Sequence, residues 1–374
     1  MNRTYKVAKS LTRGVVVTSE KASSYQGKAV KTVIAAAAAT LVAGSAMAAS
    51  YIDPVEGAKV YADTTAEQTD TLNDSIVYKK TENGAGALVT PNQSYTFDKT
   101  LWVIADQANA DAAQAPKYVQ ANGFFMSSSA ANDSKLTNKG TIYVTALNKA
   151  HYWATHAMSG DKGEIINDGT IIAKNAVALA SGSNGNGVKI INNGTIVVEN
   201  QGRAIGLEAG TAPVAENNGT IMVGTLAEGA EQIIGVYIGD NVTGSSFTNK
   251  KGGVINAAAE GAIAIGFYKG SNNTATLATG SVTQGDIVVS SFTGSTDSPT
   301  ASTSNINIEK DASVTGDVIV KFGTAALTGA EGAAVDGDLI AANGSATVAE
   351  ELTFNNVSVG AAAVAADDDS EAAT

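Results

Sequence analysis

Apolar residues along this chain fall in short runs that are separated by clusters of Ser, Asn and Gly. From about residue 117, each unit has two such runs. One follows a recurring polar phrase, as at Ile196–Val198, and the other precedes the next phrase, as at Ala204–Leu207. The runs have the usual length of β-strands, and the clusters between them are typical of turns. The pattern therefore predicts an all-β chain of many short strands.

The recurring phrase is Asn, any residue, Gly, Thr and Ile, and it stands at 138–142, 167–171, 192–196 and 217–221. Its glycines step by 29, 25 and 25 residues. A fixed step of this size is typical of a repeat architecture in which each unit stacks on the next. Such phrases also mark hairpin turns, but the unit is long enough for a full solenoid coil. We predict a right-handed parallel β-helix of roughly eight coils, because parallel crossovers are overwhelmingly right-handed.

The Asn and Gly of the phrase are the predicted structural corner residues. Glycine reaches positive φ without steric cost, so we expect it to turn the chain at each corner. If the coils stack in register, the asparagines lie above one another and their amides pair along the axis as a ladder. The corner residues are Asn138, Gly140, Asn167, Gly169, Asn192, Gly194, Asn217 and Gly219.

The later units drift from this phrase. Residues 247–255 are a degenerate copy, and a second phrase with Gly-Asp then recurs at 282–287, 314–318 and 335–339. Its aspartates, Asp286, Asp317 and Asp338, are expected to line up along one face. A stripe of this kind could hold Ca²⁺, but we favour solvated corner residues.

The N-terminus predicts export. Residues 32–48 form an apolar, Ala-rich run that follows Lys28 and Lys31 and ends in the small-residue motif Ala-Met-Ala. A basic region, an apolar run and small residues are typical of a secretory signal peptide, here cleaved between Ala48 and Ala49. The alternative is a membrane anchor, which the short, weakly apolar run does not favour.

The region before that run is longer than a signal peptide needs. It begins Met-Asn-Arg-Thr-Tyr-Lys-Val, and a Val-rich stretch later ends in Ser19-Glu20. This resembles the extended signal peptide region of large bacterial autotransporters, although the usual Trp near Lys9 is missing and Lys21 stands where Leu is common. The resemblance covers about the first 30 residues and implies a Gram-negative source and a cell-surface fate.

The repeats at about 117–345 also resemble the β-helical passenger domains of classical type V autotransporters. Those proteins end in a translocating barrel of alternating strands. This sequence ends in an acidic, Ala-rich stretch instead. We therefore expect the barrel to be absent from this chain, which would be a fragment, a truncated product or a passenger with a separate translocator.

The chain is predicted to have four segments. They are an extended signal peptide at 1–48, an irregular N-terminal segment at 49–92, the β-helix at 93–360 and a disordered acidic tail at 361–374. The second segment is polar and acidic without a clear period, as in linkers. The alternating, aromatic stretch 95–104 is expected to cap the first coil, because an open end exposes strand edges.

Charge and composition narrow the choice of partner. Residues 1–48 hold seven of the 24 basic residues but one of the 36 acidic residues, so the remaining chain has 17 and 35, a net charge of −18. Arg203 is the only Arg beyond residue 48, and there is no Cys. Phosphate contacts need Lys and Arg, so we expect no nucleic-acid partner.

Candidate chemistry is sparse. His151 and His156 are the two histidines of the chain. They provide too few ligands for a metal site, so we predict no metal or cofactor and expect surface or loop histidines. A β-helix enzyme that cleaves polysaccharides needs Arg, Lys or His beside acidic groups, and basic residues are scarce here. Serine-protease, P-loop and dinucleotide-binding motifs are absent from the sequence.

These observations favour an exported cell-surface passenger, an adhesin or structural surface protein without catalysis. The expected partners are the Sec export machinery, an outer-membrane translocator and a ligand on a host or neighbouring cell. The expected location is the cell surface or the extracellular space where a barrel is present, and the periplasm otherwise. A trimeric autotransporter adhesin and a carbohydrate-active β-helix enzyme stay open as alternatives. Two-partner secreted adhesins carry Asn-Pro-Asn motifs that this chain lacks.

Overall fold

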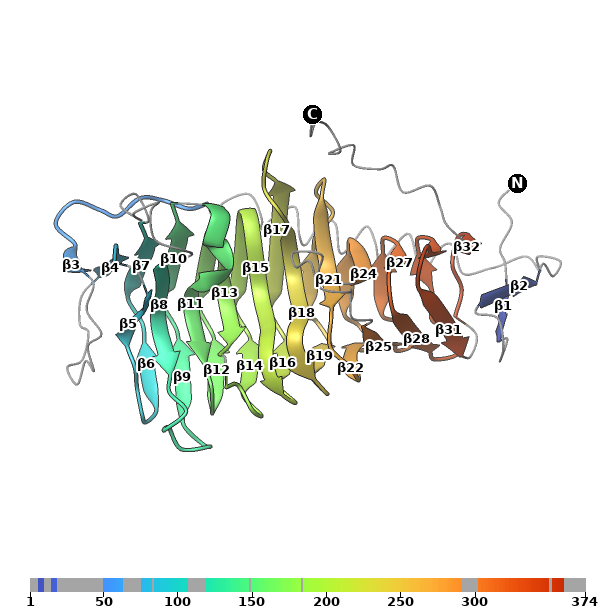
Figure 1. The fold of residues 1–374 in the computed structure, drawn as a ribbon, viewed down its shortest axis with the longest axis horizontal. Coiled ribbons are helices and arrows are strands. Elements are labelled where there is room, and N and C mark those ends of the chain that lie inside the picture. Colours follow the sequence, from blue (N-terminus) through green and yellow to red (C-terminus); the bar gives the residue numbers. More distant parts are fainter. Residues whose placement is uncertain are drawn as a thin grey trace, which may run out of the picture.

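The computed structural model describes residues 6–9, 15–18, 50–62, 75–82, 84–106, 119–147, 149–182, 184–290, 302–349 and 352–359. From β3 onward the strands stack coil on coil into an elongated parallel β-helix (Figure 1). A separate antiparallel pair is formed by β1 (Lys6–Lys9) and β2 (Val15–Thr18). The all-β class and the parallel coil are thus confirmed, whereas the right-handed sense stays a prediction.

One side of the rod is a sheet of ten strands, which we call the ten-stranded wall. This number of strands exceeds the roughly eight coils predicted, because the coils at both ends of the rod lack the Asn-x-Gly-Thr phrase. The strands are β6 (Tyr95–Phe97), β9 (Lys135–Asn138), β12 (Glu164–Asn167), β14 (Lys189–Asn192), β16 (Val214–Asn217), β19 (Ser246–Asn249), β22 (Asn273–Leu277), β25 (Thr303–Ile308), β28 (Thr324–Gly329) and β31 (Ser345–Ala349).

A second sheet of 20 strands provides the other sides. This one sheet forms two walls of the rod. The walls belong to a single sheet because β13 (Thr170–Ser181) and β15 (Thr195–Thr211) are long enough to run through both. The phrase wall, which follows the Asn corners, also contains β3 (Lys59–Ala62), β4 (Ile76–Lys80), β7 (Thr100–Ala105), β10 (Thr141–Ala146), β17 (Thr220–Leu226), β20 (Val254–Asn256), β23 (Val282–Gln284), β26 (Ser313–Thr315) and β29 (Val335–Asp336).

The third wall completes each coil. Its other strands are β5 (Gly84–Val89), β8 (Val119–Met126), β11 (Thr155–Gly160), β18 (Ile233–Thr243), β21 (Ala262–Tyr268), β24 (Asp286–Ser290), β27 (Val318–Val320), β30 (Leu339–Ala341) and β32 (Val357–Val359). A short 3-10 helix, η1 (Lys149–Ala154), precedes β11.

The repeated phrase stacks in register. Each Thr of the phrase pairs with the Thr of the next coil, and each following Ile pairs with the next Ile. The isoleucines Ile142, Ile171, Ile196 and Ile221 are fully buried in the core of the rod. Burying one such side chain contributes about 1.5–3 kcal/mol relative to leaving it exposed. The repeat therefore places a continuous apolar column inside the coils.

The β-helix begins before residue 93. Strands β4 and β5 lie within the segment predicted to be irregular, and they pair in parallel with β7 and β8. Leu88 of β5 is fully buried. The stretch 95–104 is also not a terminal cap, because β7 has β4 on one side and β10 on the other. The sequence did not indicate this earlier coil because it carries no copy of the phrase.

Some predicted features fall outside the described residues, among them the cleavage position at Ala48 and Ala49 and the acidic tail at 361–374. Within the described ranges, none of the helices has the length and apolar character needed to cross a bilayer.

Candidate functional site

The predicted corner asparagines form a continuous ladder inside the rod. The Nδ2 amide of Asn138 donates to Oδ1 of Asn167, that of Asn167 to Asn192, and that of Asn192 to Asn217, each at 2.8 Å. All four side chains are fully buried, and each residue ends a strand of the ten-stranded wall. A buried amide without a hydrogen bond is costly, so each rung depends on the next.

The ladder has a fifth member. Asn217 donates to Oδ1 of Asn249 at 2.9 Å, and Asn249 donates to the hydroxyl oxygen of Thr283 at 3.2 Å. At the other end, Oδ1 of Asn138 accepts the backbone N–H of Gly140 at 3.1 Å. Both ends of the ladder are therefore closed by hydrogen-bonding groups of the chain. Asn249 lies in the degenerate copy of the phrase, which is why the repeat alone did not single it out.

The glycines of the phrase act differently from the prediction. Positive φ is absent at Gly140, Gly169, Gly194 and Gly219. A Cβ on Gly194 would instead overlap the carbonyl oxygen of Gly169 in the preceding coil. That oxygen accepts the N–H of Thr195 at 2.9 Å. The expected positive φ was wrong: glycine is required because consecutive coils approach too closely at this corner for any side chain.

Later coils turn the same corner with four residues rather than two. The third residue of each such turn has positive φ, as at Gly252 (82°), Gly280 (74°) and Asp311 (60°). The N–H of the fourth residue bonds to the carbonyl of the first, as from Gly253 to Lys250 at 2.8 Å. This is typical of a β-turn with a left-handed third residue. The positive φ expected of the phrase thus occurs in the coils that have lost it.

The Gly-Asp phrase forms a second, outer ladder. Oδ1 of Asp286 accepts the backbone N–H of Asp317 at 2.9 Å, and Oδ1 of Asp317 accepts the N–H of Asp338 at 2.8 Å. Burial raises the pKa of the Asp286 carboxyl above its usual 3.8, although the bond from Asp317 opposes this. Across the described ranges, His, Cys, Asp and Glu side chains form no group of three able to hold a metal ion.

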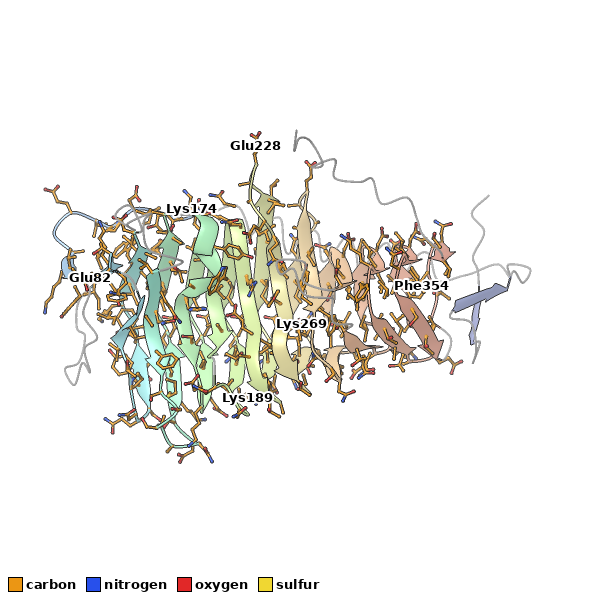
Figure 2. All side chains as sticks on the ribbon, viewed as in Figure 1. Glu82, Lys174, Lys189, Glu228, Lys269 and Phe354 are labelled. Carbon is orange, nitrogen blue, oxygen red and sulfur yellow. The ribbon has the colours of Figure 1, made fainter. Side chains whose placement is uncertain are left out.

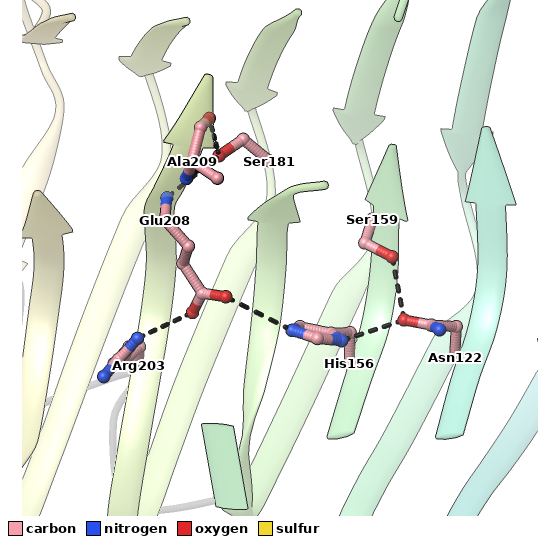
Figure 3. A network of polar contacts seen from close by, with 7 residues as sticks. All are labelled: Asn122, His156, Ser159, Ser181, Arg203, Glu208 and Ala209. Carbon is pink, nitrogen blue, oxygen red and sulfur yellow. Dashed lines mark hydrogen bonds and ion pairs between the residues drawn. The ribbon is translucent and has the colours of Figure 1, made fainter. Parts of the chain in front are cut away.

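His156 is buried, so the prediction of a surface or loop histidine was wrong for this residue. It lies on β11 and is 5 % exposed. Its Nδ1 lies 2.8 Å from Oδ1 of Asn122, which also accepts the hydroxyl of Ser159 at 2.8 Å (Figure 3). Because that oxygen is an acceptor, Nδ1 carries the proton. The other nitrogen, Nε2, faces a carboxylate oxygen of Glu208 at 3.6 Å. The backbone of His151 lies in η1.

Glu208 connects His156 to Arg203. Nη1 of Arg203 donates to Oε1 of Glu208 at 2.8 Å, and the guanidinium carbon lies 3.4 Å from the ring centroid of Tyr237. Tyr237 stacks on Tyr268 at 5.1 Å. We call His156, Arg203, Glu208, Tyr237 and Tyr268 the charge cluster.

The charge cluster lies on the outer face of the third wall. Along β15, Ala204, Ile205 and Leu207 belong to the core, so Arg203 and Glu208 point outward. Tyr152 of η1 lies over Arg203, with the guanidinium 5.7 Å from its ring centroid. Helix η1 therefore covers this part of the wall, and both Arg203 and Tyr152 are buried.

Opposite charges determine protonation in the charge cluster. Burial opposes ionisation of Glu208, but Arg203 and His156 outweigh it and hold the pKa of the carboxyl below its usual 4.5. Burial likewise favours neutral Arg203, but Tyr237 and Glu208 outweigh it and raise the pKa of the guanidinium. Both groups are therefore charged at neutral pH. The cluster ties β11, β15, β18 and β21 together through side chains, and Asn122 connects it to β8.

The chemistry open to this cluster is limited. Glycoside hydrolysis commonly uses two carboxylates on either side of the bond. Among the described residues, Glu208 is the only carboxylate in hydrogen-bond or ion-pair contact with Arg203. The arrangement is a buried clamp across several coils. The sequence signal was the single Arg beyond residue 48. Its partner Glu208 lies on the same strand, but Tyr152, Tyr237 and His156 come from other units of different length and could not be paired with it from spacing.

The outer face of the ten-stranded wall changes along the rod. In β9 to β16 it carries charged and aliphatic residues, with ion pairs such as Lys135–Glu164 at 3.0 Å and Lys189–Glu216 at 3.4 Å. In β19 to β31 the outward positions with described side chains are uncharged, and we call them the hydroxyl face. They are Ser246, Thr248, Thr274, Thr276, Thr303, Asn305, Asn307, Thr324, Ala326, Thr328, Ser345 and Thr347.

The side chains of the hydroxyl face hydrogen-bond across strands. Asn305 donates to Thr274 and Asn307 to Thr276, each at 3.4 Å, and the hydroxyl of Thr328 donates to Asn307 at 2.5 Å. Cross-strand pairs of this kind hold the side chains in a regular array.

Fold and sites together define a parallel β-helix protein with an internal Asn ladder, an outer Asp ladder, a buried charge cluster and one neutral face. No family model, curated protein or solved structure gives a significant match to the chain.

Proposed function

We propose that the chain is an exported, rod-like passenger that acts at the cell surface as an adhesin or structural surface protein, without catalysis. The hydroxyl face is the observation that carries the adhesive part of this proposal. Export is supported by the signal-peptide pattern that ends at Ala48. The resemblance of the first 30 residues to the autotransporter extended signal supports the same route.

The hydroxyl face suits a neutral ligand. Its strands lie about 4.8 Å apart, so hydroxyl and amide groups repeat at a fixed interval along the rod. The chain as a whole carries a net charge of −12, yet this face is uncharged. Hydroxyl and amide groups can both donate and accept hydrogen bonds. Neutral glycans on a host or neighbouring cell therefore match this surface better than anionic ligands do.

Export would use the Sec machinery, and surface display would use an outer-membrane translocator. In this proposal the rod holds the hydroxyl face away from the membrane. With a translocator, the passenger would be displayed at the cell surface or released into the medium. Without one, it would remain in the periplasm.

The proposal can be tested in a Gram-negative host that expresses the full chain. Cell fractionation and mass spectrometry should find a processed chain outside the cytoplasm. The purified chain should then bind neutral glycans on an array, and Thr276→Lys on the hydroxyl face should weaken binding at least about tenfold. Val214→Lys, an outward position of the same wall in the charged half, is the matched control and should bind as the wild type does.

A cytoplasmic, unprocessed chain would rule out export. Equal binding by both variants would rule out the hydroxyl face as the adhesive surface. Release of shortened glycans during the binding assay would favour the carbohydrate-active alternative.

A further inference from the structure

The segment that follows the predicted cleavage position lies against the phrase wall. We call residues 50–55 the docked segment. The indole N–H of Trp102 donates to the carbonyl of Ile52 at 3.0 Å, and the ring of Tyr51 meets Tyr143 edge-on at 5.9 Å. Trp102 and Tyr143 stack on each other at 5.6 Å. The aromatic side chains of β7 and β10 therefore form the surface on which the docked segment rests.

The start of the docked segment is held by one carboxylate. The hydroxyl of Ser50 donates to Oε1 of Glu199 at 2.6 Å. The backbone N–H of Tyr51 lies 3.3 Å from Oε1 and 3.4 Å from Oε2 of the same residue. Glu199 is on β15, so these contacts join residues 148 and 149 positions apart in the chain. Both carboxylate oxygens are thus directed at the first described residues after the signal peptide.

The charges around Glu199 leave room for a cation. Its strand neighbour is Lys174 on β13, but the Lys174 ammonium lies over the Tyr51 ring, 5.6 Å from its centroid. In the described part of the chain, Glu199 takes part in no ion pair. Asp53 is the other charged group near Tyr51, and burial followed by Asp53 raises the pKa of the Tyr51 phenol to about 12. Tyr51 is therefore neutral and adds no charge beside Glu199.

Cleavage after Ala48 would place a positive charge beside this carboxylate. Ala49 would become the first residue, one peptide bond before Ser50. Consecutive Cα atoms lie about 3.8 Å apart, so the new ammonium would stay close to the Ser50–Glu199 contact. In the precursor the same nitrogen belongs to a neutral peptide bond.

We propose that Glu199 is the receptor for the α-ammonium of Ala49 and that signal cleavage locks the docked segment onto the phrase wall. This inference rests on the proposed export and on processing after Ala48. A charge-assisted hydrogen bond is roughly twice as strong as a neutral one. Processing would therefore convert a neutral strap into a charged latch that protects the mature N-terminus.

The test uses the full chain, exported and processed by a Gram-negative host, with its N-terminus identified by mass spectrometry. An aminopeptidase that needs a free, mobile N-terminus is then added. We expect Glu199→Gln to be trimmed at least about tenfold faster than the wild type. Glu228→Gln is the matched control, because Glu228 projects from the rod after β17 (Figure 2). It should be trimmed at the wild-type rate.

A second measurement reports docking without a protease. Trp102 contacts the docked segment, and the other Trp of the chain is Trp153. In a Trp153→Phe background, Glu199→Gln should shift Trp102 emission to longer wavelength while the far-UV circular dichroism stays unchanged.

The outcomes separate the two proposals. A chain cleaved after Ala48 whose N-terminus is trimmed equally fast in the wild type and Glu199→Gln overturns the receptor role alone. Cleavage at another bond also overturns that role while leaving export intact. A chain that stays unprocessed in the cytoplasm overturns the proposed export itself.

Discussion

The two halves of the rod turn the same corner by different means. Between the ten-stranded wall and the phrase wall, the N-terminal coils use two residues and a buried Asn, as at Asn192. The C-terminal coils use four residues and a left-handed residue, as at Gly280. Asn249 combines both, because its side chain belongs to the ladder while Gly252 turns the chain.

The difference explains why the repeat is strict in one half and drifts in the other. In the ladder, each amide depends on the one in the next coil, so an Asn stands at this corner in every coil, at steps of 29, 25, 25 and 32 residues. Beyond the ladder the equivalent positions are Phe97 at one end and Leu277 at the other. These side chains need only to be apolar. The four-residue turn of the C-terminal coils is closed by a hydrogen bond within the turn, so it requires no particular residue in the neighbouring coil.

The largest effect is expected from breaking the ladder in its middle. Asn192→Leu copies Leu277, the residue at this position in the first coil beyond the ladder. It leaves Oδ1 of Asn217 without its donor and leaves Nδ2 of Asn167 with only the carbonyl of Thr195 at 3.4 Å. Each orphaned buried group costs about 1–3 kcal/mol, so we expect a loss of roughly 4 kcal/mol in the free energy of unfolding. Urea unfolding measures the loss. The adjacent, exposed Asn193→Ala should change stability by less than about 0.5 kcal/mol; equal effects would refute the ladder's role.

A comparable effect is expected from Glu208→Gln, which removes the central acid of the charge cluster. Breaking one side of a buried ion pair costs about 3–5 kcal/mol, and Glu208 is partly exposed, so we expect about 3 kcal/mol at pH 7.

The pH dependence has a definite sign. The pKa of Glu208 is lower in the folded chain than its usual 4.5, so its contribution is present above 4.5 and is lost as the pH falls through the folded value. Stability curves from pH 7 to 3 should therefore converge for the wild type and Glu208→Gln. Parallel curves would contradict the assigned role.

Two glycine substitutions compare the stability of the two kinds of corner directly. Gly194→Ala forces a Cβ into the carbonyl of Gly169, and we expect a loss of about 2–3 kcal/mol from overpacking. Gly252→Ala meets no atom within 4 Å, but it places a side chain at φ 82°, which costs about 1–2 kcal/mol. Hydrogen exchange should show the first change spreading into neighbouring coils and the second staying local. A larger loss of stability for Gly252→Ala than for Gly194→Ala would contradict the proposed difference between the two kinds of corner.

The smallest effect is expected at the outer Asp ladder. The pKa of Asp286 is raised in the folded chain, so folding favours its protonated form and stability falls as the pH rises through that value. Asp286→Asn keeps an oxygen for the N–H of Asp317 and removes the charge. It should stabilise the chain at pH 7 by less than about 1 kcal/mol, because solvent screens this half-buried site. Thermal unfolding at pH 7 would test this, and a loss of stability would show that the charge is needed.

The sequence predicted features that depend on a repeated local pattern. The parallel coil and the stacking of Asn138 to Asn217 follow from identical residues at a fixed step. The role of Gly194 could not be predicted, because it depends on how closely two coils approach. The charge cluster was also out of reach, since His156 and Glu208 come from coils whose pairing passes through unequal loops.

The two 25-residue units of the ladder make the rod divisible. Removing residues 167–191 would bring Asn192 beside Asn138, with the same Asn, Gly, Thr and Ile in register as before. Unequal recombination between such segments of a gene can therefore delete or duplicate one coil without creating a new junction. Rod length becomes a heritable trait that can vary by whole units, independently of the uncharged surface in the other half.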